Sequence, residues 1–356
     1  MKIGKLGLAT ALTGALFMTQ CKPKTANIEP VADTETESSV QASWANYMVA
    51  DIEQLCAFMG EDKYDNHFYY PAVFNNNYEA VAELNAVQKY VTWRNGPVMC
   101  RDGRTREGSV FMYTYVDLEA NPDADINSRY YRDYGFVGNI SFGNYYVDGW
   151  EVKLQDDGNR MYLYNKRKTR IYTADQILTF RIKGKVIFKH PTDENKDITW
   201  EGELYKQVVN STDKEIFDPS AQKAINWFVL DKNGKLIKAA LCKYYGSSFG
   251  YTEGKKPYKM EIKPETPLVR DYMCTSDPVA SVSAASTGTV PFTFTTDQHH
   301  PFISGIASFT TGTTAENKYP RQIYFGNEAT PDQAVQCDNT GVVNIKGNYY
   351  PINFWK

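Results

Sequence analysis

Apolar and polar residues alternate over short stretches along most of the chain, which is the pattern of β-strands with one buried face. From Val110 to Val116, apolar and aromatic side chains dominate. Asp148-Gly149 stands between two aromatic and β-branched runs, and both residue types tolerate the positive φ of a tight turn. The pattern therefore predicts a strand at residues 110–116 and a hairpin turn at residues 148–149.

Turn signals recur at short intervals further along the chain, with no long helical stretch between them. They predict turns at Gly184 (between 177–182 and 185–188), at Asp193–Lys196, at Asn233-Gly234 and at Lys346-Gly347. Such a rhythm is typical of an all-β fold, mainly an antiparallel meander of hairpins. Residues 44–60 are the exception, because their apolar positions follow roughly helical spacing and predict a short helix against the sheet.

The first residues predict an export signal. Lys2 and Lys5 precede an apolar run from Leu6 to Met18 that is too short to span a bilayer comfortably. The segment ends in Thr19-Gln20-Cys21, which resembles a relaxed lipobox, the cleavage site before a cysteine that receives lipid such as palmitate. We expect a signal peptide at residues 1–20 and lipidation of Cys21.

Composition divides the rest of the chain. Residues 21–43 are rich in Ser, Thr and acidic residues, and they predict a flexible tether, whereas residues 44–356 predict the β-rich region. Segments around Cys100 and Cys337 echo each other, since in each a strand and an Asn precede the cysteine and a glycine turn follows it. A repeat would divide the region into two related units, 44–155 and 156–356.

Five cysteines follow Cys21. In an exported protein they favour disulfides over metal ligands, and none has Cys-x-x-Cys spacing. The order of the cysteines alone does not fix their pairing. The internal echo makes Cys56 with Cys100 and Cys274 with Cys337 the simplest arrangement, with Cys242 left over.

Charge and histidine content argue against several functions. The formal net charge of −3 becomes −5 without Lys2 and Lys5, so a nucleic-acid partner is not expected. The four histidines (His67, His190, His299 and His300) accompany no nucleophile motif and no third metal ligand. We therefore expect no enzyme, no cofactor and no metal site.

Two polar segments keep an alternative open. Asn121 to Asn127 alternate oxygen-bearing side chains suited to calcium, but the segment lacks the EF-hand glycine and glutamate, so a solvated loop is favoured. Arg104 and Arg106 could clamp an anionic partner. A structural role, bridging acidic side chains with stems on aromatic rings, is favoured instead.

Several motifs resemble tyrosine-rich, β-strand-rich lipoproteins of Bacteroidota. They are Cys-x-Asp-Gly-Arg-Thr-Arg-x-Gly at 100–108, Arg129–Asp133, Ile140–Val152, Thr266–Arg270 and Cys337-Asp338-Asn339. The resemblance implies an exported, lipid-anchored β protein and no established activity. Lys22 and Lys24 stand where surface-exported relatives carry acidic residues, which favours the periplasmic face of the outer membrane over the cell surface.

Three functions fit these observations. The first is a non-enzymatic envelope protein with a structural or protein-interaction role, held at the membrane by its lipid. The second is a carbohydrate-binding lipoprotein that uses aromatic surface, suggested by doublets at 69–70, 130–131, 145–146, 244–245 and 349–350. About half of those rings should lie in the core, because neighbouring residues of a strand face opposite sides. The third is a hydrolase with an unrecognised carboxylate pair.

Overall fold

The computed structural model describes parts of the chain between residues 36 and 354. The described ranges are 36–61, 78–85, 88–99, 104–127, 130–156, 160–173, 176–219, 225–232, 236–274, 302–311, 320–326 and 340–354. The predicted signal peptide and Cys21 lie outside these ranges, as do Cys100, Cys337, His67, His299 and His300.

Fifteen of the described strands form one antiparallel sheet, so the expected all-β meander is confirmed. Its main path runs β1-β2-β3-β4-β5-β7-β8-β11-β12-β14-β15-β16-β17, while β6 bridges β4 and β7, and β13 pairs with β11. The bounds are β1 Tyr78–Asn85, β2 Gln88–Met99, β3 Thr105–Val116, β4 Phe136–Val147, β5 Trp150–Leu154, β6 Met161–Asn165, β7 Leu178–Lys189, β8 Ile198–Val208, β11 Leu241–Thr252, β12 Lys256–Ile262, β13 Leu268–Asp271, β14 Gly305–Thr311, β15 Arg321–Phe325, β16 Thr340–Ile345 and β17 Asn348–Asn353. A separate pair joins β9 (Phe228–Leu230) to β10 (Leu236–Ala239).

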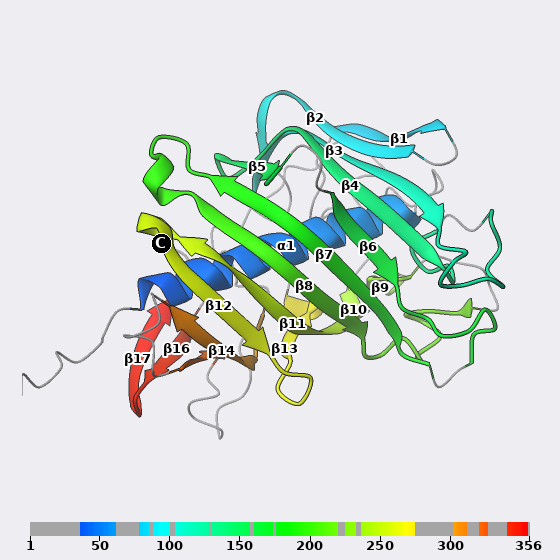
Figure 1. Ribbon diagram of the computed structural model, residues 1–356. Coiled ribbons are helices and arrows are strands. Elements are labelled where there is room, and N and C mark those ends of the chain that lie inside the picture. The colour runs from blue at the N-terminus through cyan, green and yellow to red at the C-terminus, as the bar shows by residue number, and fades with distance from the viewer. Residues whose placement is uncertain are drawn as a thin grey trace, which may run out of the picture. The chain divides into compact units, whose positions relative to one another are not determined.

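The helix α1 (Glu37–Glu61) lies against the inner face of this sheet and passes behind β7, β8 and β11 in Figure 1. Its 25 residues make it longer than the short helix expected from residues 44–60. Every residue of α1 is buried except Glu37, Val40, Gln41 and Trp44. The helix is therefore the centre of the core rather than a cover on its surface.

The predicted tether is too long at its carboxyl end, because residues 37–43 belong to α1. Ser38, Ser39 and Ser43 are buried, and the Ser43 hydroxyl donates to the Ser39 carbonyl at 2.8 Å. The Ser43 hydroxyl, bonded within its own helix, needs no water, so a polar composition did not mean a solvated segment here. The proposed boundary between residues 155 and 156 is also not a structural division, since β5 and β7 pair across it.

Most predicted turns are confirmed. Asp148-Gly149 joins β4 to β5 with φ of +49° and +82°, and Lys346-Gly347 joins β16 to β17 with φ of +54° and +86°. The short helix η2 (Glu194–Lys196) connects β7 to β8. Residues on either side of Asn233-Gly234 pair as β9 and β10.

The turn predicted at Gly184 is wrong, because β7 runs straight through it and Gly184 pairs with Gly202 of β8. A Cβ on Gly184 would lie 2.7 Å from the Met161 side chain of β6. The glycine therefore serves close packing against a neighbouring strand, a role glycine often has inside strands.

The predicted pairing of Cys56 with Cys100 is wrong. Cys56 is a free thiol, fully buried on α1, where burial and the charge of Glu53 raise its pKa well above the usual value. Cys242 is free and buried, as the predicted arrangement left it, and burial raises its pKa to about 12. Both thiols are packing residues at neutral pH. The pairing of Cys274 with Cys337 stays a prediction, since Cys337 lies outside the described residues.

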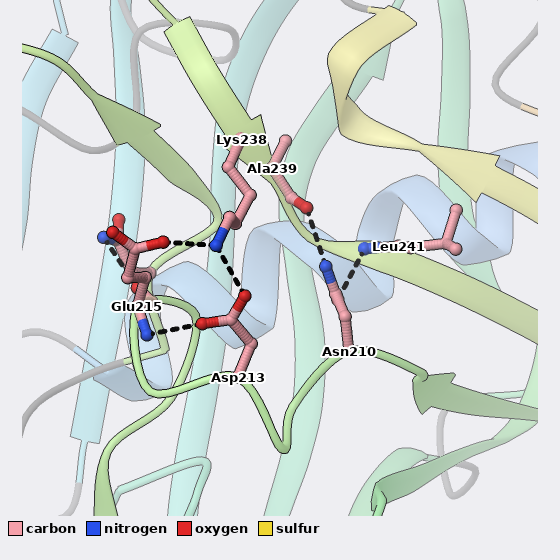
Figure 2. A network of polar contacts seen from close by, with 7 residues as sticks. Asn210, Asp213, Glu215, Lys238, Ala239 and Leu241 are labelled. Atoms are coloured by element: carbon pink, nitrogen blue, oxygen red, sulfur yellow. Dashed lines mark hydrogen bonds and ion pairs between the residues drawn. The ribbon is translucent and has the colours of Figure 1, made fainter.

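A polar network fixes the end of the β9–β10 pair against the main sheet (Figure 2). The side-chain amide of Asn210 donates to the carbonyl of Ala239 at 2.9 Å, and its oxygen accepts from the backbone N–H of Leu241 at 2.9 Å. Lys238 donates to Asp213 at 2.6 Å and also bonds to Glu215. Asn210 therefore supplies the hydrogen bonds that a neighbouring strand would supply where the chain passes from β10 to β11.

Replacing Asn210 with Ala should lower the free energy of unfolding by about 1–3 kcal/mol, because two backbone groups lose their partner. The amide hydrogen of Leu241 should also exchange faster with solvent, which hydrogen-exchange NMR measures. Lys238→Met is the matched control, because its ion pairs lie at the surface and should contribute little. Equal effects of the two variants would contradict this role for Asn210.

Candidate ligand-binding groove

A groove of about 910 Å³ opens beside the first two turns of α1. The four residues of α1 that are not buried, Glu37, Val40, Gln41 and Trp44, all line it. They follow helical spacing of three and four residues, so they form one face of the helix. The other walls are Pro97 of β2, Thr105 of β3, Asp148 to Trp150 at the start of β5, His190, Lys196 and Ile198 around η2, Glu253 after β11, and Pro351 to Phe354 of β17.

Aromatic rings build one wall of the groove. The ring centroids of Trp44 and Trp150 lie 4.8 Å apart at an interplanar angle of 47°. Phe188 of β7 supports Trp44 edge-on at 5.2 Å, and His190 stands edge-on to Trp150 at 4.9 Å. Packing of each ring against the next holds the wall in place without a ligand.

This aromatic wall presents hydrogen-bond donors that the described residues leave unused. Trp44 and Trp150 lie partly open to solvent, and neither indole N–H has an acceptor among the described residues. Among the buried tryptophans, the indole N–H of Trp200 donates to Asn46 at 3.0 Å, whereas that of Trp227 has no acceptor among the described residues. His190 accepts from the Thr192 backbone through Nδ1 at 3.3 Å, which leaves Nε2 to carry the proton in the neutral ring.

Polar side chains that line the groove are also held in place by the fold. The Gln41 amide donates to Glu253 at 3.1 Å and accepts from the Glu253 backbone at 3.0 Å, so α1 fixes the short helix η4 (Glu253–Lys255). Asp148 accepts from the Thr105 backbone and from Arg104 at 2.8 and 2.9 Å. The groove therefore combines flat aromatic surface with oriented hydrogen-bonding groups.

Arg104 and Arg106 have the structural role that the sequence favoured. Arg106 donates to the buried carboxylate of Asp51 on α1 at 2.9 Å. Arg104 lies 4.6 Å from the centre of the Tyr47 ring and pairs with Asp148. Burial alone would raise the pKa of Asp51, but the charges of Arg106, Arg104 and Arg270 hold that pKa below its usual value. Both arginines therefore lock α1 to the sheet beside the groove.

In each described aromatic doublet, one ring packs in the core and its neighbour lies at the surface, close to the half expected. Tyr131, Tyr145 and Tyr244 are buried, while the neighbours Tyr130, Tyr146 and Tyr245 are partly exposed. In the last doublet Tyr349 is exposed and Tyr350 packs against the core. None of these residues lines the groove, and the doublet at 69–70 lies outside the described residues.

Of the other sequence candidates, Asp125 and Asn127 line a second pocket of about 460 Å³ together with Tyr130. Residues 121–127 form a surface loop in which Asp125 accepts from the Asn127 backbone. Within the described ranges, no group of three or more His, Cys, Asp or Glu side chains is placed to hold a metal ion. In the same part of the chain, no helix combines the length and apolar character that crossing a membrane requires.

Sequence reasoning missed the groove because its residues come from separate elements. Trp44 stood at the predicted start of a helix, Trp150 in a hairpin and His190 among four unconnected histidines. The one usable signal was the Asp148-Gly149-Trp150 turn, which places an aromatic residue directly after a tight bend. Nothing in the sequence shows that α1 and η2 meet there.

No known protein family, curated protein or solved structure matches the chain.

Proposed function

We propose that this protein is an exported, lipid-anchored envelope protein that binds a carbohydrate in the groove beside the first turns of α1. Sugars present flat faces of C–H groups and rims of hydroxyl groups. A binding site for them needs rings for the faces and fixed polar groups for the hydroxyls, which is a general feature of small-molecule sites. The groove offers both.

The partnerless donors of Trp44, Trp150 and His190 carry the proposal. No described residue accepts from either indole N–H, so both donors on this wall are available to a ligand with acceptor oxygens. A purely apolar ligand would leave these donors unused. A polymeric or protein partner with no ring structure would not need the aromatic wall.

Export and lipid anchoring rest on the sequence alone. The supports are Lys2 and Lys5, the apolar run that follows and the lipobox-like segment before Cys21. The resemblance to β-rich lipoproteins of Bacteroidota points the same way, and we place the protein on the periplasmic face of the outer membrane. No catalytic role is proposed.

Metabolic labelling with an alkyne palmitate tests lipid anchoring. It should mark the wild-type chain and not the Cys21→Ala variant.

The test of carbohydrate binding is a glycan array probed with the full chain in non-ionic detergent. We expect binding to at least one glycan class, with Trp150→Ala weakening it at least about tenfold, equivalent to about 1.4 kcal/mol. Trp150→Phe keeps a ring and loses the N–H, and it should fall between wild type and Trp150→Ala.

Phe249→Ala is the matched control, because Phe249 is an exposed aromatic residue outside the groove. Its binding to the glycans that depend on Trp150 should equal that of the wild type. An array with no signal above background, or equal loss in Phe249→Ala and Trp150→Ala, would overturn the proposal.

A further inference from the structure

A second aromatic surface lies on the outer face of the sheet, the face turned away from α1. It consists of Tyr113 and Tyr115 on β3 and of Tyr162 and Tyr164 on β6, and we call it the tyrosine patch. The rings of Tyr113 and Tyr115 are 6.5 Å apart, and those of Tyr162 and Tyr164 are 6.1 Å apart. Tyr113 is 50% exposed and Tyr115 is 38% exposed.

Strand register makes the patch continuous. Tyr113 pairs with Asn139 of β4, which pairs with Tyr162, and Tyr115 pairs with Val137, which pairs with Tyr164. Directly paired residues point to the same face, so the two tyrosine pairs flank β4 about two strand spacings apart, roughly 9.5 Å. Val137, which lies between Tyr115 and Tyr164 on this face, is only 1% exposed. Burial and the electrostatic influence of Tyr164, Tyr162 and the Asp117 carboxylate raise the pKa of Tyr115.

Free cations border the tyrosine patch. Lys183 of β7 pairs in register with Tyr162, and Lys166 follows the same face of β6 two residues after Tyr164. Both lysines are exposed, and neither has a side-chain partner among the described residues. Arg181 lies 4.4 Å from the centre of the Tyr164 ring and pairs with Glu203 at 3.6 Å. Acidic groups lie close as well, because Lys183 also pairs in register with Glu203 of β8 and the charge of Asp117 acts on Tyr115 and Tyr164.

We infer that the tyrosine patch binds an acidic polysaccharide, with sugar rings over the tyrosines and carboxylate groups on Lys166 and Lys183. Two pairs of rings two strands apart match a repeating chain of rings better than a single small molecule. Tyrosine rings with polar tips also suit sugars better than the interior of a bilayer, because the patch contains no aliphatic side chain that would insert. This surface is separate from the groove and does not depend on it.

The experiment is native gel electrophoresis of the full chain, in non-ionic detergent, through gels containing polygalacturonate or neutral dextran. Polygalacturonate should retard the protein, added salt should reduce the retardation, and dextran should not retard it. The variants Tyr162→Ala/Tyr164→Ala and Lys166→Gln/Lys183→Gln should each weaken retardation at least about fivefold. The lysine variant replaces only exposed side chains and should fold, so it tests the proposal even if the tyrosine variant does not fold.

A control tests whether the effect is specific to the tyrosine patch. Tyr349 is an exposed tyrosine on β17 at the far end of the sheet, and Tyr349→Ala should be retarded like the wild type. Wild-type retardation of the lysine variant, or equal retardation by dextran, would overturn the inference. A membrane role would also overturn the inference. It would show as wild-type protein that polygalacturonate does not retard but that binds phosphatidylglycerol vesicles, with this binding lost in the lysine variant.

Discussion

Lys206→Met should destabilise the protein by about 3–5 kcal/mol, because it leaves a buried carboxylate without its cation. Lys206 is 1% exposed on β8, where Nζ lies 2.9 Å from the Glu53 carboxylate and 2.6 Å from the Gln54 amide oxygen of α1. It also lies 4.2 Å from the centre of the Trp227 ring. Urea unfolding followed by tryptophan fluorescence measures the loss.

A double variant separates the ion pair from simple packing. Glu53→Gln/Lys206→Met removes both charges, and it should recover most of the stability lost in Lys206→Met, since a buried pair can be replaced by neutral groups at little cost. Lys183→Met, on the exposed face of β7, should change stability by less than about 0.5 kcal/mol. A Lys206→Met variant as stable as Lys183→Met would show that this pair does not hold α1 in the sheet.

Gly108→Ala should cost about 4 kcal/mol or more and prevent accumulation of folded protein at 37 °C. Gly108 lies in β3 with φ of +81°, and an added Cβ would sit 1.8 Å from the carbonyl oxygen of Asn144 on β4. That oxygen belongs to the backbone of the neighbouring strand, so it cannot move without breaking the β3–β4 ladder. The register shift between Glu107 and Ser109 lies at the same place.

Gly149→Ala is the matched control for backbone strain. Gly149 has nearly the same φ, +82°, but nothing lies within 4 Å of the added Cβ. The only cost of an alanine at this position is then its left-handed backbone conformation, which should lower the free energy of unfolding by about 1–2 kcal/mol. Thermal unfolding monitored by circular dichroism compares the two variants. Equal melting temperatures would contradict the close approach of β3 and β4.

The sequence predicted this fold where the signal was local. Asp148-Gly149 and Lys346-Gly347 are turns in the structure because positive φ is a property of those residues themselves. Gly184 misled for the opposite reason, since its role depends on Met161 of another strand. The same limit applies to Cys56. Its surroundings are set by how α1 packs against the sheet, and its position among the cysteines of the sequence does not reveal that it is a free thiol.

The polar half of α1 was the hardest part to predict. Asp51, Glu53 and Gln54 on a helix normally indicate a solvent-exposed face. Here each meets a side chain from the sheet or the segment after it: Arg106, Lys206 and Tyr272 respectively. Such pairs join residues far apart in the sequence, so no window along the chain reveals them. The groove escaped prediction in the same way, because its walls come from α1 and from several strand ends.

The central claim is that the groove beside Trp44 and Trp150 is the ligand site. Its most direct test is an ¹⁵N–¹H spectrum of the tryptophan indole groups, recorded with and without the glycan that binds most strongly on the array. The account predicts that the signals of Trp44 and Trp150 shift, whereas the signal of Trp200, bonded to Asn46 in the core, stays in place. Unchanged signals of Trp44 and Trp150 in the presence of bound glycan would contradict it.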